Sequence, residues 1–121
     1  MTDGAKWQVR LSAAAETDFQ NIVRWTSEHF GEGQAHAYAD TLSLAIEALT
    51  DGPRIIGAKE RDEIAKGIFT LHVARGGRKG RHFVMYRVEA PTEPPVVDVL
   101  RLLHDSMDFT RHLPSPENGN A

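Results

Sequence analysis

The chain of 121 residues has the length of one domain with one hydrophobic core. It contains no cysteine, which excludes disulfides and cysteine-based metal sites, and no apolar run long enough for a signal peptide or a membrane span, so we expect a cytoplasmic protein. The formal charge of −3 and the pI of about 6.0 argue against a protein that coats nucleic acid through a broad basic surface.

The first half of the chain predicts a short strand followed by two helices. Residues 7–11 alternate apolar and polar side chains, which is typical of an edge strand. Ser12 is a suitable N-cap for a helix over residues 13–30, where apolar side chains recur at helical spacing. The glycines of residues 31–33 end that helix, and a second amphipathic pattern covers residues 34–50. The short break predicts an antiparallel helical hairpin.

A glycine-rich β-hairpin is predicted over residues 67–88. Phe69, Leu71 and Val73 alternate with other side chains in the first strand, and Val84 and Tyr86 do so in the second. Residues 66–87 carry six cations and no acid, in a chain whose total charge is negative. The cations are Lys66, Arg75, Arg78, Lys79, Arg81 and Arg87. Such a patch indicates an anionic ligand or the acidic face of a partner.

The segments around the hairpin are assigned by their composition. Residues 54–66 are polar and without clear period, which predicts a loop, and residues 90–95 are a proline-rich loop. Residues 96–103 form the most apolar strand candidate and are expected in the centre of the sheet. Residues 106–113 are compatible with a short helix, and residues 114–121 with a disordered tail that follows a single domain of residues 1–113.

This order of elements, β-α-α-β-β-β, predicts an α+β fold in which the N-terminal helical hairpin packs on one face of a twisted antiparallel sheet. The late strands carry bulky apolar side chains at both alternating sets of positions, and two helices cover only one face. We therefore expect an exposed apolar face that an amphipathic partner helix covers. The alternative is that residues 105–113 fold back over it.

The residues give no strong catalytic or metal signature. The glycines of the hairpin lack the context of a phosphate-binding loop, and the six histidines show no ligand spacing, so no cofactor and no metal are expected. His104, at the end of a buried strand beside Asp105, is the best single acid or base, although a structural histidine is the simpler interpretation. Arg81, Arg87 and His82 are able to stabilise a phosphate or to pair with a partner's acids, and we favour the partner.

The chain resembles the ParE toxins of bacterial toxin–antitoxin modules, within the RelE/ParE superfamily. The resemblance covers about residues 6–113 and depends on the order and spacing of several short motifs. These are VRLSAAAETDF at residues 9–19, the helical pair with QAHAYADTLSLAIEAL at residues 34–49, GP at residues 52–53, RHFVMYRV at residues 81–88 and VLRLLHDSMDF at residues 99–109. Ser106 departs from the pattern, because many relatives carry an arginine near this position.

The resemblance implies a helical hairpin on a twisted antiparallel sheet and a cognate antitoxin of the ParD type, which wraps the toxin partly as a helix in a groove. It implies inhibition of DNA gyrase by binding, not by catalysis. RelE relatives instead cleave messenger RNA in the ribosome; that alternative would use Arg81, Arg87 and His104 on the scissile phosphate. It is disfavoured by the low pI and by the absence of a tyrosine after Tyr86. An inactive toxin kept for complex formation is a third possibility.

Two sets of contact residues follow from this interpretation. The target is expected to contact the basic hairpin and the C-terminal segment, namely Arg75, Arg78, Lys79, Arg81, His104, Asp108, Phe109 and Arg111. The antitoxin is expected to contact the apolar groove and the hairpin helices, namely Trp25, Phe30, Tyr38 and Met85. No membrane and no direct sequence-specific nucleic-acid partner is expected.

Overall fold

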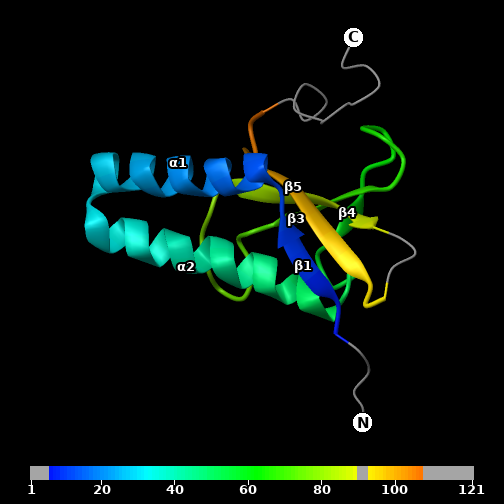
Figure 1. Ribbon diagram of the computed structural model, residues 1–121. Coiled ribbons are helices and arrows are strands. Elements are labelled where there is room, and N and C mark those ends of the chain that lie inside the picture. Colours follow the sequence, from blue (N-terminus) through cyan, green and yellow to red (C-terminus); the bar gives the residue numbers. More distant parts are fainter. Residues whose placement is uncertain (1–5, 90–92, 108–121) are drawn as a thin grey trace.

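The computed structural model describes residues 6–89 and 93–107, which form two helices packed on a five-stranded sheet (Figure 1). The α+β class and the order of the main elements are as predicted, and α1 has the predicted bounds. The elements are β1 (Gln8–Leu11), α1 (Ala13–Phe30), α2 (Glu32–Ala48), the 3-10 turn η1 (Leu49–Asp51), β2 (Lys59–Glu60), β3 (Ile68–His72), β4 (His82–Glu89) and β5 (Val96–His104).

The sheet has the order β1-β5-β4-β3-β2, and it is mixed where the sequence predicted only antiparallel pairs. Strands β2 to β5 pair antiparallel, but β1 lies parallel to β5, with Gln8 opposite Val96. The two helices carry the chain from β1 at one edge of the sheet to β2 at the other, and three antiparallel pairings then return it to β5 beside β1. Strand β2 lies in the predicted loop; its two residues are too few to produce a readable alternation.

The start of α1 is tied to the last strand by Ser12. The hydroxyl oxygen of Ser12 accepts a hydrogen bond from the amide of Ala15 at 3.0 Å, which satisfies one of the free amides of the first turn. The same hydroxyl donates to the carbonyl oxygen of Leu100 at 2.8 Å. The predicted N-cap therefore also fixes the position of α1 on β5.

A second polar link joins α1 to β5 further along the helix. The guanidinium of Arg101 donates from Nε to Oδ2 of Asp18 at 2.7 Å and from Nη2 to Oδ1 at 2.9 Å. The backbone amide of Leu102 donates to the same carboxylate at 2.9 Å. The hydrogen bond that Arg101 donates to Asp18 raises the pKa of Arg101. Two charges are thereby satisfied at a partly buried helix–sheet contact.

The main core lies between the helices and one face of the sheet. Ala15 of α1 and Leu42 of α2 pack there with one of the two alternating sets of side chains along β3 and β4. The rings of Phe69 and Tyr86 stack with their centroids 5.4 Å apart. The Tyr86 hydroxyl donates to the carbonyl oxygen of Pro53 at 2.7 Å, and burial raises the pKa of this phenol.

The opposite face of the sheet is not open, so the expectation of an exposed apolar face there is wrong. Ile68, Met85, Leu100 and Leu103 form a second buried cluster, against which Ala65 packs. Met85 has no exposed surface, so it cannot serve as an antitoxin contact without rearrangement. The segment before β3, which covers this face, was not recognised from the sequence because it is polar and shows no hydrophobic periodicity.

Arg61 shows how this polar segment lies on the second face. Its guanidinium lies 5.6 Å from the centre of the Phe83 ring, and its Nε donates to the hydroxyl of Thr70 at 2.9 Å. The alternative cover predicted from the sequence, residues 105–113, falls mostly outside the described residues, as do most of the predicted C-terminal helix and the tail. In the part of the chain that the structure describes, no helix is long and apolar enough to cross a bilayer.

Candidate functional site

A groove of about 1210 Å³ opens between the helical hairpin, the β3–β4 loop and the end of β5, and we call it the helix–loop groove. Helix α1 contributes Ile22, Trp25 and Phe30, and helix α2 contributes Ala37, Tyr38 and Thr41. The facing wall consists of residues 77–82, with His104, Ser106 and Met107 at the end of β5. Three segments far apart in the sequence therefore line one surface.

Aromatic side chains from the end of α1 form the apolar wall of the groove. Trp25 is 53% exposed and Phe30 is 63% exposed, and their rings meet edge to face with centroids 5.8 Å apart. His29 stacks on Trp25 at 4.0 Å. The turn between α1 and α2 extends beyond the sheet (Figure 1), in agreement with the exposure of both rings. Such an exposed aromatic patch is typical of a partner site.

The cationic wall is the β3–β4 loop, which turns through Gly76 and Gly77 with φ angles of 62° and 81°. Arg78 does not point freely into solvent. Its Nε donates to the hydroxyl of Thr41 at 2.8 Å and its Nη2 to the carbonyl oxygen of Ala37 at 2.9 Å. Arg78 therefore fastens the loop to α2, a role that the sequence did not predict.

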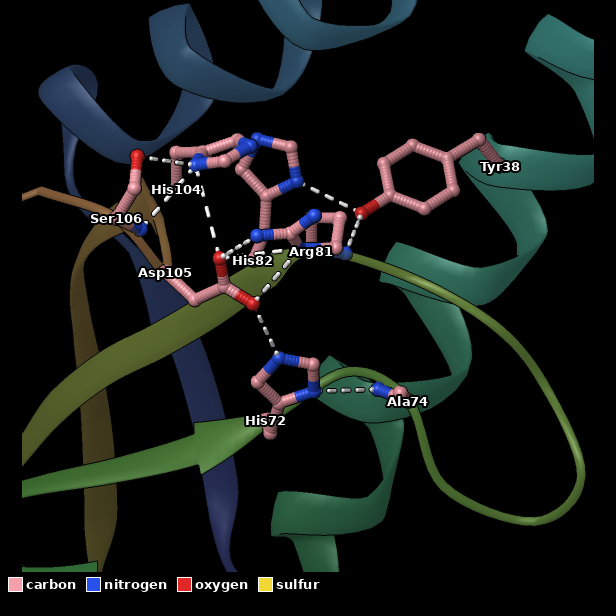
Figure 2. Close-up of polar contacts among 8 residues, drawn as sticks. All are labelled: Tyr38, His72, Ala74, Arg81, His82, His104, Asp105 and Ser106. Carbon is pink, nitrogen blue, oxygen red and sulfur yellow. Dashed lines mark hydrogen bonds and ion pairs between the residues drawn. The ribbon is translucent and has the colours of Figure 1, made fainter.

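Tyr38 forms the second connection between α2 and the loop. Its hydroxyl oxygen accepts from the backbone amide of Arg81 at 2.9 Å and lies 2.7 Å from Nδ1 of His82 (Figure 2). The Tyr38 hydroxyl thus joins the backbone at Arg81 to the ring of His82, and the His82 tautomer sets which of the two rings' groups donates in the second contact. A Cβ at Gly80 would lie 2.9 Å from the Tyr38 hydroxyl, so glycine is needed for this close approach.

Burial keeps His82 uncharged at neutral pH. It lowers the pKa of His82 to about 4, and the nearby imidazole of His104 contributes in the same direction. The two rings meet edge to face, with centroids 5.2 Å apart. Burial also raises the pKa of Tyr38. Both groups are therefore neutral partners in a hydrogen bond at ordinary pH.

Asp105 is the centre of the polar cluster beside the groove (Figure 2). Its carboxylate accepts from Nε and Nη2 of Arg81 at 3.1 and 3.0 Å, and from Nε2 of His72 at 3.1 Å. His72 is held in place because its Nδ1 accepts from the amide of Ala74 at 3.0 Å. The Arg81 hydrogen bond, and then that of His72, lower the pKa of Asp105 to about 2. The charge of Arg81 is therefore compensated within the chain.

His104 faces the same carboxylate from the end of β5. Its Nδ1 lies 3.7 Å from Oδ1 of Asp105 and accepts from the amide of Ser106 at 3.2 Å. This agrees with a structural role at the strand end. Within residues 6–89 and 93–107, no group of three or more His, Asp or Glu side chains is arranged to hold a metal ion.

The structure brings together most of the two predicted contact sets, which the sequence treated as separate. Trp25, Phe30 and Tyr38, expected to contact the antitoxin, line the helix–loop groove together with cations expected to contact the target. These cations are Arg78, Lys79 and Arg81, and His104 lies beside them. Asp108, Phe109 and Arg111 lie outside the described residues.

Two predicted residues lie elsewhere. Arg75 lines a second groove, where its Nη2 donates to the carbonyl oxygen of Ile56 at 3.1 Å. Arg87 pairs in register with Ile68 and Asp98 near the far end of β4. Six residues of strand separate it from Arg81, which corresponds to roughly 20 Å. The structure therefore does not assemble Arg81, Arg87 and His104 around one phosphate.

Sequence reasoning did not identify the roles of Asp105 and His72. The sequence signal that could have revealed Asp105 was an acid directly after the buried strand of residues 96–104. In the structure, the end of this strand pairs with the first residues of β4. His72 lies one strand away, opposite Phe83. Without the register of the three strands, these side chains could not be placed together.

Comparisons with known proteins agree on one family. The sequence profile described as ParE toxin of type II toxin-antitoxin system, parDE, matches residues 9–109. Toxin ParE1 of Mycobacterium tuberculosis is 35% identical over 103 residues, which cover 85% of this chain and 94% of the relative. Toxin ParE1 of Caulobacter vibrioides is 32% identical over 104 residues, which cover 86% of this chain and 95% of the relative. A chain of the chromosomal ParDE system from P. aeruginosa has a similar fold, with a TM-score of 0.67 and 17% sequence identity. The match covers 84% of this chain and 98% of that chain.

Proposed function

This chain belongs to the ParE toxin family of type II toxin–antitoxin systems, and from this premise we propose that it inhibits DNA gyrase by binding and is neutralised by a ParD-like antitoxin seated in the helix–loop groove. The family resemblance supports gyrase as the target, because gyrase binding is the activity described for ParE toxins. We place this activity in the cytoplasm, where gyrase acts.

The single observation that carries the antitoxin site is the exposed aromatic wall of the groove. Trp25 and Phe30 each leave more than half of their surface in solvent, although both are large hydrophobic side chains. Burying an aromatic side chain of this size supplies a large share of the binding energy of an interface. A partner that covers both rings gains that energy, and for a ParE-type toxin the antitoxin is the expected partner.

The polar cluster supports a binding protein over a ribonuclease. Cleavage of RNA at a phosphate needs a base in reach of the attacking hydroxyl and cations on the phosphate. Asp105 is held by Arg81 and His72, Nδ1 of His82 is engaged by the Tyr38 hydroxyl, and Arg87 lies far along β4. Target contacts are proposed for the accessible rim, with Lys79 and Arg81 nearest to the groove and Arg75 at the second groove.

The test compares two targets with one preparation of toxin. We expect the purified chain to inhibit DNA supercoiling by gyrase and to leave in vitro translation unaffected, because binding and not RNA cleavage is its mechanism. Toxin preincubated with the antitoxin encoded in the neighbouring reading frame serves as the control and should leave supercoiling intact. Cleavage of message in the ribosomal A site, or normal growth of cells that express the toxin alone, contradicts the proposal.

A further inference from the structure

The charges that line the helix–loop groove are of one sign. Its formally charged lining residues are Arg78, Lys79 and Arg81, and none of the described lining residues is Asp or Glu. The chain as a whole carries a net charge of −3, so this surface contrasts with the rest of the molecule. A partner with acidic side chains is the complementary occupant.

The three cations are not equivalent, because two of them are already engaged within the chain. Arg78 donates to Thr41 and Ala37 of α2, and Arg81 pairs with Asp105. Lys79 lies between them, is exposed, and makes no hydrogen bond or ion pair with any other described residue. Its ammonium group is therefore the charge of the groove that remains available for a partner.

The apolar wall indicates what kind of partner carries the acid. Trp25, Phe30 and Met107 offer exposed apolar surface a short way from the cationic loop, which suits a helix with one apolar face and acids on its flank. An α-helix presents an apolar stripe and a polar flank at the same time, so it is able to meet both walls of the groove. A single nucleic-acid strand is also able to stack its bases on aromatic rings, but the net charge of −3 of the whole chain disfavours a polyanion as the partner.

We propose that Lys79 pairs with a carboxylate on the flank of an amphipathic antitoxin helix in this groove, and that this pair selects the cognate antitoxin among related ones. The inference rests on the proposed function, since it assigns the antitoxin to the groove. Arg78 and Arg81 shape and anchor the loop that presents Lys79. A related antitoxin with a lysine at the facing position is rejected, because like charges meet at the rim.

The test compares Lys79→Glu with Lys66→Glu, a matched charge reversal at an exposed lysine that lines the second groove. The partner is the full-length antitoxin encoded in the neighbouring reading frame, measured by surface plasmon resonance at two salt concentrations. We expect Lys79→Glu to weaken binding about tenfold, mainly through a slower association rate, and to flatten its salt dependence. Lys66→Glu should change Kd by less than about twofold.

A charge swap identifies the facing carboxylate. One acid-to-lysine substitution in the antitoxin should restore binding to the Lys79→Glu toxin and weaken binding to the unchanged toxin. Equal effects of Lys79→Glu and Lys66→Glu, or no antitoxin change that restores binding, overturn the role of Lys79 while the groove remains the antitoxin site. Failure of the unchanged toxin to bind this antitoxin at all overturns the proposed function as well.

Discussion

The double substitution Trp25→Ala and Phe30→Ala is expected to weaken antitoxin binding by about 100-fold or more, which corresponds to about 3 kcal/mol. Both rings are more than half exposed in the free chain, so their truncation removes little packing from the fold. In the complex they would be covered by the antitoxin helix, and the loss of both anchors removes the centre of the interface. The stability of the free toxin should change by less than about 1 kcal/mol.

Isothermal titration calorimetry measures this effect, with thermal unfolding of the free toxin as the check on folding. Ile56→Ala is the matched control, because Ile56 is 91% exposed but lines the second groove. We expect the control to bind the antitoxin like the unchanged chain. If Ile56→Ala weakens binding as strongly as the double substitution, the antitoxin does not depend on the helix–loop groove.

Asp18→Ala is expected to destabilise the free toxin by about 3 kcal/mol, the largest effect on stability that we predict. The substitution leaves the guanidinium of Arg101 and the amide of Leu102 without the carboxylate that now accepts from both. A partly buried charge without a partner is costly, and the contact of α1 with β5 is loosened. For a domain of this size, Tm should fall by roughly 10 °C.

The control for this prediction is Asp40→Ala on α2. Asp40 is exposed and makes no ion pair or hydrogen bond with the other described residues, so its removal should change stability by less than about 0.5 kcal/mol. Urea unfolding of the three proteins at neutral pH gives the comparison. Equal midpoints for Asp18→Ala and the unchanged chain would show that the Asp18–Arg101 pair does not hold the helix to the sheet.

Local signals in the sequence were sufficient for most of the fold. Ser12 before an alanine run fixed the start of α1, and the glycine at position 31 fixed its end, because cap and turn chemistry depends on neighbouring residues alone. The alternation of Phe69, Leu71 and Val73 correctly predicted a strand, and in the structure these three side chains lie in the core beneath the helices. These features need no knowledge of distant parts of the chain.

Long-range relations could not be predicted in the same way. The β-bulge opposite Met85 and Tyr86 puts Val99 and Leu102 on the face toward the helices although they are three residues apart, a switch that alternation along β5 alone does not reveal. The residues that cover the second face of the sheet belong to the polar segment before β3, which shows no hydrophobic periodicity. For this reason the sequence placed the open apolar surface on the sheet, whereas the structure places it at the end of the helical hairpin.

The candidate site was predicted by residue type and not by geometry. The sequence identified Trp25, Phe30, Tyr38 and the cations of the hairpin, but it assigned them to two different partners. Only the structure shows that they line one groove, and that Arg78 and Arg81 are engaged within the chain while Lys79 is available. The sequence gives the charge of each arginine, but it does not tell which acceptor the guanidinium group bonds to in the folded chain.

The most direct test of the proposed antitoxin site is the fluorescence of Trp25 during binding. The chain has two tryptophans, so Trp7→Phe leaves Trp25 as the single reporter. On addition of the antitoxin encoded in the neighbouring reading frame, we predict that its emission shifts to shorter wavelength and that acrylamide no longer quenches it efficiently. A complex that forms with the emission and the quenching of Trp25 unchanged would contradict the account.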